Sequence, residues 1–288
     1  MCNPGAQSWH LAGYVIYNKF ANLIPCPIDH IMPIIPHRAP TTDVLASRGK
    51  IAVVVPATNT VVQPEFEAMR PPGVTNHVTR MYLPPRPYVD MAQYRKALDT
   101  EEGNLDEALG LVLPCEPHVV AHGHSIHSFR GDRARAKQEQ DTLEALCGVP
   151  FITPSMAVLA GLEAIGNPKR VAILTPYWPP ADTLITEFFT ACGYDVVCAD
   201  GLKATGPTAV AQITLDEIRA GFKLVDRVEA EVLIHVGTNL PVSAITAEIE
   251  AAHGKPLIGV NVATYWQALR RIGISDRIEG FGILLEQH

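Results

Sequence analysis

Seven short apolar runs, rich in β-branched residues, divide the chain from residue 49 onward and predict buried strands. The first run, Ile51-Ala52-Val53-Val54-Val55, has no polar interruption and ends at Pro56. A continuous apolar run is typical of a strand that is covered on both faces, as in a parallel sheet. The runs span 51–55, 119–121, 151–153, 171–174, 196–197, 232–234 and 257–260.

Between these runs lie stretches in which apolar residues recur at the i, i+3, i+4 spacing of a helix with one buried face. They span 105–113, 134–146, 157–165, 182–191, 215–228, 244–252 and 263–272. Strands that alternate with helices are typical of βαβ units and predict a parallel sheet. Short right-handed connections then favour a doubly wound α/β fold.

The pattern also repeats within the chain, which predicts two pseudo-symmetric α/β lobes. VVAHGHS at 119–125 resembles LIHVGTN at 233–239, and PFITPSMAVLAGLEAIG at 150–166 resembles PLIGVNVATYWQALRRIG at 256–273. We assign residues 49–153, with a C-terminal helix in 261–288, to lobe 1, and residues 154–260 to lobe 2. Each lobe is expected to be a parallel sheet flanked by helices. An active site is expected in the interlobe cleft, outside the carboxyl ends of the strands.

Residues 1–48 do not follow this pattern. They contain prolines at 4, 25, 27, 33, 36 and 40, have no helical period and carry few charges. Pro-rich segments rarely form regular elements, so we predict a disordered or loosely draped N-terminal extension. The alternative is an arm that packs on a partner subunit in a homo-oligomer.

Composition narrows the classes of function. The 288 residues are 47% hydrophobic and 18% charged, which excludes a disordered chain. The net charge of -7 argues against a nucleic-acid partner, because no basic domain is available to neutralise phosphates. No apolar run approaches the roughly 20 residues that cross a bilayer, so no membrane partner is expected. Six cysteines form no CxxC pair and no secretory signal is recognisable, which predicts a cytoplasmic protein.

Hydroxyl, amide and glycine residues gather directly after four of the predicted strands. Ligands collect at strand carboxyl ends, and such residues offer hydrogen-bond donors to a carboxylate or to an enediolate oxygen. Ordinary turns and helix caps use the same residue types, so a single segment would carry little information. Four segments at facing positions predict a substrate site. They are Thr58-Asn59-Thr60, Gly123-His124-Ser125, Pro176-Tyr177 and Gly237-Thr238-Asn239.

These motifs, in this order, resemble the aspartate/glutamate racemase superfamily, and within it the maleate cis-trans isomerases and arylmalonate decarboxylases. The resemblance covers about residues 49–284. It implies an enzyme without cofactor or metal that binds a small carboxylate between its lobes. It further implies that Thr58 and Asn59 bind carboxylate, that residues 123–125 form part of the pocket and that Tyr177 contacts the substrate. The matching motifs are VPATNT (55–60), GHSIHSFRG (123–131), PFITPSMAVLAGL (150–162), RVAILTPY (170–177) and GTNL (237–240).

The cysteines that this superfamily uses as acid, base or nucleophile are missing from the matching positions. The resemblance implies one cysteine near Thr58 and a second just before Thr238, where this chain has Val236 and Gly237. Histidine is the expected substitute, because an imidazole titrates near neutral pH and moves a proton in either direction.

Histidines follow matching strands in the two predicted lobes, and a pair that faces across the lobes would serve as acid and base. The catalytic candidates are therefore His124 and His235, with Ser125 beside His124. His122 and His124 are expected to share one face of their strand, because side chains alternate with period two. An alternative is that His122, His124 and His235 bind a divalent metal.

The resemblance thus implies a cofactor-independent enzyme that acts on a small carboxylate or dicarboxylate. The reaction class implied by the resemblance is isomerisation or decarboxylation through a stabilised carbanion or enediolate, with histidine as acid and base. One alternative is a hydrolase of a small amide or imide, in which Ser/His or a His-bound metal activates water. A second alternative is a catalytically inactive carboxylate-binding protein.

Overall fold

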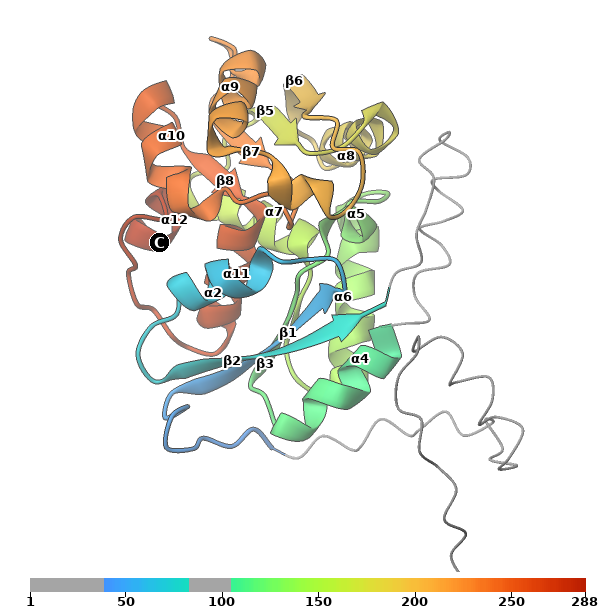
Figure 1. The fold of residues 1–288 in the computed structure, drawn as a ribbon, viewed down its shortest axis with the longest axis vertical. Helices are drawn as coiled ribbons and strands as arrows, with labels where there is room; N and C mark the ends of the chain where they lie inside the picture. Colours follow the sequence, from blue (N-terminus) through green and yellow to red (C-terminus); the bar gives the residue numbers. More distant parts are fainter. Residues whose placement is uncertain (1–38, 83–104) are drawn as a thin grey trace, which may run out of the picture. The chain divides into compact units, whose positions relative to one another are not determined.

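The computed structural model describes residues 39–82 and 105–288, which form two parallel four-stranded sheets flanked by helices (Figure 1). The strand orders are β2-β1-β3-β4 and β6-β5-β7-β8. We call the part built on β1–β4 the first lobe and the part built on β5–β8 the second lobe. The strands are β1 (Gly49–Pro56), β2 (Val74–Met81), β3 (Val119–His122), β4 (Phe151–Ile152), β5 (Arg170–Thr175), β6 (Asp195–Gly201), β7 (Val232–His235) and β8 (Leu257–Gly259).

Helices connect the strands as the periodicity predicts. The α-helices are α2 (Val62–Ala68), α4 (Leu105–Val112), α5 (Ser125–Ser128), α6 (Arg133–Cys147), α7 (Pro154–Ala164), α8 (Pro179–Ala191), α9 (Leu215–Val225), α10 (Thr246–His253), α11 (Val260–Arg271) and α12 (Ile283–Gln287). The 3-10 helices are η2 (Leu113–Cys115), η3 (Ala209–Gln212) and η4 (Ser243–Ile245).

The two sheets have the same topology, so β1, β2, β3 and β4 correspond to β5, β6, β7 and β8. This confirms the predicted fold of two similar parallel sheets flanked by helices. The seven predicted strands are all present. The set of apolar runs omitted β2, which is the edge strand of the first sheet. Its middle residues, Thr75, Asn76 and His77, are only partly buried, and therefore an apolar run is not needed there.

Helices α7 and α11 lie between the two sheets and join the lobes (Figure 1). Helix α7 follows the last strand of the first sheet and contacts β8 of the second, where Gly161 lies against Ile258. Helix α11 follows β8 and packs against β3, β4 and α2 of the first lobe as well as against α7. Each lobe thus contributes a helix to the packing of the other.

The two faces of each sheet pack against different helices. On the faces that meet α7 and α11, residues of both sheets belong to one apolar cluster, which includes Val53 of β1 and Ile234 of β7. The other face of the first sheet is covered by α4, and that of the second sheet by α9 and α10. Full burial of each such aliphatic side chain stabilises the fold by about 1.5–3 kcal/mol. The shared cluster fixes the carboxyl ends of both sheets near each other.

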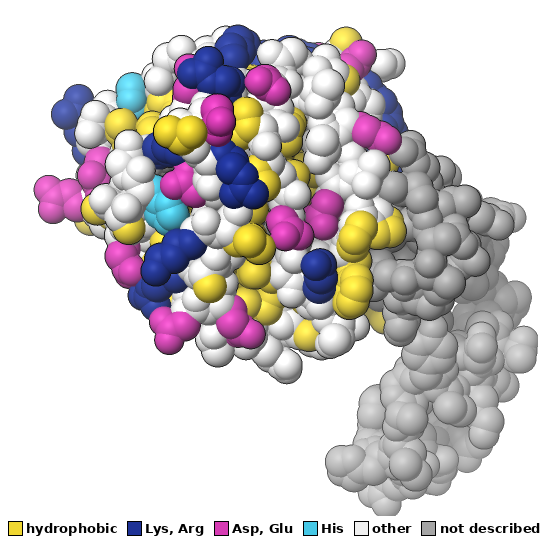
Figure 2. Space-filling view, turned by 90° about the horizontal axis from the view of Figure 1, so that it is seen from above, with side chains coloured by type: hydrophobic (Ala, Val, Ile, Leu, Met, Phe, Trp, Pro, Cys, Tyr) yellow, Lys and Arg dark blue, Asp and Glu magenta, His cyan; other side chains and the backbone are white. Residues whose placement is uncertain are grey.

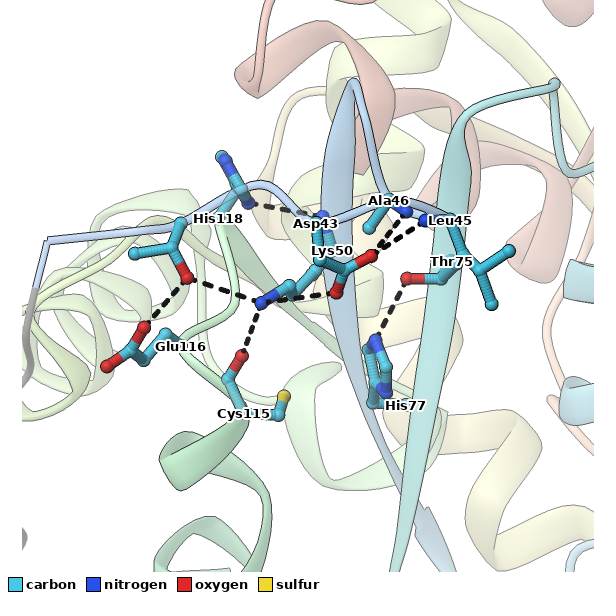
Figure 3. A network of polar contacts seen from close by, with 10 residues as sticks. Asp43, Leu45, Ala46, Lys50, Thr75, His77, Cys115, Glu116 and His118 are labelled. Carbon is cyan, nitrogen blue, oxygen red and sulfur yellow. Dashed lines mark hydrogen bonds and ion pairs between the residues drawn. The ribbon is translucent and has the colours of Figure 1, made fainter.

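A polar network fixes the chain at the opposite end of the first sheet, beside the amino end of β1 (Figure 3). The Lys50 Nζ donates to Thr41 Oγ1 at 3.3 Å and to the Cys115 carbonyl at 3.2 Å, and it lies 3.5 Å from the Asp43 carboxylate. The Asp43 carboxylate in turn accepts from the backbone N–H of Ala46. This network anchors residues 41–46 to the sheet, and it lies away from the strand ends where ligands are expected.

Some expectations lie outside the described residues. These are the expectations for residues 1–38 of the N-terminal extension; the connection 83–104 between β2 and α4 also lies outside the described residues. Among the described helices, none combines the length and apolar character needed to cross a bilayer. On the face of the molecule seen in Figure 2, acidic and basic side chains are interspersed over the described surface.

Candidate active site

The four predicted strand-end segments meet at one place between the lobes. Residues 58–60 follow β1, residues 123–125 follow β3, Tyr177 follows β5 and residues 237–239 follow β7. Since the strands in each sheet are parallel, their carboxyl ends lie along one edge. Hydrogen bonds between the lobes then join these edges, with Asn59 and Ser125 of the first lobe bonded to Thr238 of the second.

Ser125 is the centre of this cluster. Its Oγ accepts a hydrogen bond from the Thr238 backbone N–H at 3.3 Å and lies 3.0 Å from the hydroxyl of Tyr177. Ser125 is fully buried, whereas Tyr177 is half-buried. Two hydroxyls and one backbone N–H therefore converge from both lobes. Fixed donors of this kind stabilise a negatively charged oxygen, because they do not have to reorient when the charge develops.

Asn59 and Thr238 lock the two loops together. The Thr238 Oγ1 donates to the Gly123 carbonyl at 2.8 Å and accepts from the Asn59 Nδ2 at 3.3 Å. The Asn59 Oδ1 accepts from the backbone N–H groups of Val61 and Val62, which caps the start of α2. Asn59 is thereby held in one orientation. Its amide positions Thr238, and its backbone carbonyl accepts from Arg80 at 2.7 Å.

Asn239 makes a second connection between the lobes. Its Oδ1 accepts from the Thr60 backbone N–H at 2.9 Å, and its Nδ2 donates to the carbonyls of Pro207 at 2.8 Å and Thr58 at 3.4 Å. Thr58 and Thr60 thus meet the second lobe through backbone atoms. Their predicted role in substrate binding stays a prediction.

Gly237 allows the backbone to turn tightly between β7 and Thr238. Its φ is +153°, and a Cβ at this position would lie 2.4 Å from the Pro176 Cδ and 2.6 Å from its Cγ. Such distances are far inside van der Waals contact, so only glycine fits against Pro176. The glycine therefore lets the Thr238 N–H reach Ser125.

His124 and His235 lie in different surroundings, and their pairing as acid and base across the lobes stays a prediction. His124 lines a cavity of about 460 Å³ in the first lobe, together with His122 and residues of α4 and α6. His235 is buried in the second lobe, on the same face of β7 as Leu233, which packs in the cluster with α9 and α10. The alternation of side chains along each strand turns both His122 and His235 away from the shared core. His122 and His124 do lie on one side of the sheet, as predicted.

The environments of these histidines differ. Burial lowers the pKa of His122 to about 4 and that of His235 to about 3. The His127 Nε2 lies 3.0 Å from Arg130 Nη2, and its Nδ1 lies 3.4 Å from Glu139. Arg130 is buried and also donates to the His127 carbonyl. The described residues contain no group of three His, Cys, Asp or Glu side chains that could hold a metal, so His122, His124 and His235 do not form the alternative metal site.

Three residues that the sequence did not predict also belong to this cluster: Glu65, Ser243 and Asn261. Glu65 of α2 accepts hydrogen bonds from Ser243 of the second lobe and from Asn261 of α11, and the Asn261 Nδ2 also donates to the Thr238 carbonyl at 2.9 Å. Asn261 carried a weak signal, since it stands in the repeat where Ser155 stands in the first copy. The sequence gives no signal for Glu65, because acidic residues are common in the first turn of a helix.

The chain is similar in sequence to known isomerases and decarboxylases. Residues 106–285 match the family model described as arylmalonate decarboxylase. The maleate isomerase of Pseudomonas putida is 28% identical over 250 residues, which cover 82% of this chain and 96% of that protein. The arylmalonate decarboxylase of Bordetella bronchiseptica is 28% identical over 191 residues, covering 65% of this chain and 78% of that protein.

Solved structures show the same fold. The maleate cis-trans isomerase of Nocardia farcinica, solved with a covalently bound succinylcysteine intermediate, superposes with a TM-score of 0.75 at 20% identity. The match covers 83% of this chain and 98% of that one. An unliganded arylmalonate decarboxylase superposes with a TM-score of 0.66 at 21% identity, over 83% and 99% of the two chains.

Proposed function

Because the chain belongs to the arylmalonate decarboxylase family and is an isomerase- or decarboxylase-like enzyme, we propose that it acts on a small carboxylate through a stabilised carbanion or enediolate. We propose further that the chain does this without a cofactor. The substrate carboxylate binds where the lobes meet, and the carbon next to it loses or gains a substituent.

The convergence of Ser125, Tyr177 and the Thr238 N–H carries this proposal. When the carbon next to a carboxylate becomes a carbanion, the charge spreads onto the carboxylate oxygens as an enediolate. Donors that already surround those oxygens stabilise the charged state more than the ground state, which lowers the barrier. In the structure these groups bond to one another at 3.0 and 3.3 Å, and a substrate oxygen would replace those contacts.

His124 is the candidate that we propose for proton transfer. His122 and His235 are fully buried and have strongly lowered pKa values, so neither accepts a proton readily near pH 7. The ring nitrogens of His127 are engaged by Arg130 and Glu139. His124 is only partly buried and directly precedes Ser125 in the chain, while its side chain lines the first-lobe cavity. It therefore replaces the predicted pair of His124 and His235.

The two alternatives find no support among the relatives. The curated relatives are isomerases and a decarboxylase, which favours neither an amide or imide hydrolase nor a catalytically inactive binding protein. Ser125 fits the proposal as a donor to an oxyanion, because its Oγ is held by Thr238 and Tyr177 rather than by a base.

Turnover of maleate and release of CO₂ from phenylmalonate test the proposal. The Ser125→Ala variant is expected to lose roughly 100-fold or more in kcat/KM on the accepted substrate, as expected when one oxyanion donor is removed. Ser275→Ala, at an exposed loop position, is the control and should leave turnover unchanged. His124→Ala should abolish turnover without changing the circular dichroism spectrum. Wild-type rates in both site variants would contradict the proposal.

A further inference from the structure

One carboxylate of the first lobe collects three hydrogen-bond donors, two from Ser243 of the second lobe and one from Asn261 of α11. The Glu65 Oε1 accepts from the Ser243 backbone N–H at 2.9 Å. Its Oε2 accepts from the Ser243 Oγ at 2.6 Å and from the Asn261 Nδ2 at 2.7 Å. Burial raises the pKa of Glu65, and these hydrogen bonds act in the opposite direction. The carboxylate is thus placed where its charge is costly, which calls for a reason beyond packing.

Asn261 carries this connection to the candidate active site. Its Nδ2 donates both to the Glu65 Oε2 and, at 2.9 Å, to the Thr238 carbonyl. Its Oδ1 is buried and has no hydrogen-bond partner among the described residues. The orientation of the amide is therefore set by the two acceptors on its nitrogen. Without Glu65, one of these two acceptors is gone and the amide is free to turn away from Thr238.

We propose that Glu65 is a positioning residue, whose carboxylate holds Asn261 and, through it, Thr238 at the place where the Thr238 N–H and the Ser125 hydroxyl bind one oxygen of the substrate carboxylate. The inference deepens the proposed function and rests on it for the identity of that oxygen. Glu65 itself touches no substrate, and its effect passes through the loop after β7.

The chemistry requires a carboxylate because three donors point at two oxygens. A glutamine has a single acceptor oxygen, and its NH₂ must then face either the Ser243 N–H or the Asn261 NH₂. The Ser243 hydroxyl can rotate and accept from an NH₂, whereas the Asn261 amide cannot accept through its nitrogen. The Glu65→Gln variant is therefore expected to keep Ser243 and lose Asn261. The loss should release the Thr238 carbonyl.

A double-mutant cycle on malonate binding tests this route. Glu65→Gln and Asn261→Ala are each expected to raise the malonate dissociation constant about 10-fold or more. The double variant should have a malonate dissociation constant no higher than that of the single variant that binds malonate more weakly. Both substitutions act through the same contact, so their effects do not add. Multiplicative effects would overturn the proposal, since independent structural damage adds in free energy. The control is Glu250→Gln, which removes a comparable carboxylate that accepts from Leu257 and Ile283 at 2.9 Å; its malonate affinity should be unchanged.

Hydrogen exchange without ligand separates this inference from the proposed function. Backbone amides of residues 237–242 should exchange faster in Glu65→Gln than in the wild type, and not in Glu250→Gln. Unchanged exchange in Glu65→Gln would overturn the positioning role, whatever the protein binds. If Glu65→Gln exchanges faster but the wild-type protein binds neither malonate nor maleate, Glu65 does position Thr238. The proposed substrate class would then be contradicted.

Discussion

His122 and His235 occupy the same position in the two sheets. Each is the last residue of the third strand, and each pairs with the strand that starts its lobe, His122 with Val54 of β1 and His235 with Leu174 of β5. Both are buried, and the Nε2 of each has no hydrogen-bond partner among the described residues. The third strand of each sheet therefore ends in a neutral histidine that points away from the shared core, although the sequence repeat aligns His122 with Val236.

This pair predicts a loss of stability in acid. Burial lowers the pKa of His122 to about 4 and of His235 to about 3, whereas histidine in the unfolded chain titrates near 6.5. Below pH 6.5 the unfolded state binds protons that the native state does not, so stability is present above that pH and is lost as the pH falls toward 4 and 3. Each histidine should contribute a slope of up to about 1.4 kcal/mol per pH unit. Urea unfolding between pH 4 and 7 measures it.

Variants of each histidine show which of them causes the pH dependence of the unfolding free energy. His122→Gln and His235→Gln should each flatten the dependence of the unfolding free energy on pH, while the exposed His288→Gln serves as the control. A pH dependence that is identical in all three variants would show that other groups account for the acid sensitivity.

Removing the hydroxyl of Tyr177 should affect activity far more than stability. Its oxygen lies 3.0 Å from the Ser125 Oγ, so Tyr177→Phe removes one of the three converging groups, and we expect a fall in kcat/KM of roughly 100-fold. The matched control is Tyr194→Phe. The Tyr194 hydroxyl donates to the Asn167 Oδ1 at 2.9 Å within the second lobe, and its loss should cost about 1 kcal/mol of stability with full activity. The reverse pattern would place the functional cluster elsewhere.

A methyl group at Gly237 should displace the loop that carries Thr238. The φ of +153° and the 2.4 Å approach of a Cβ to Pro176 predict that Gly237→Ala loses about 2 kcal/mol or more of stability and roughly 100-fold in kcat/KM. Gly110→Ala in α4 is the control, because nothing lies within 4 Å of its Cβ. That substitution should stabilise the helix by about 0.5–1 kcal/mol. Thermal unfolding and steady-state kinetics measure both effects.

The strands and the meeting of four loops could be predicted from sequence for one physical reason. A buried parallel strand needs a continuous apolar run, such as 51–55, and parallel strands present their carboxyl ends along one edge. Hydroxyl and amide residues at those ends, such as Asn59 and Thr238, therefore meet. Strand β2 was not predicted, because an edge strand tolerates polar residues such as Asn76 and needs no continuous apolar run.

The histidines and Glu65 could not be predicted in the same way. Period two shows that His122 and His124 share a face, but it does not show which face of the sheet that is. Glu65 meets Ser243 and Asn261, which lie 178 and 196 residues away in sequence. Contacts of that separation leave no local pattern in the chain, and only the packing of the two lobes brings them together.

Thiol alkylation tests the expectation that catalysis proceeds without cysteine. Burial raises the pKa of Cys147 to about 12 and raises the pKa values of Cys115 and Cys192 above the ordinary thiol value, which suppresses the reactive thiolate. None of the hydrogen bonds described for Ser125, Tyr177 and Thr238 involves a cysteine. Iodoacetamide should therefore leave turnover unchanged, even where mass spectrometry detects adducts. Inactivation that malonate prevents, with the adduct mapped to one cysteine, would instead establish a thiol mechanism and exclude His124 as the sole acid or base.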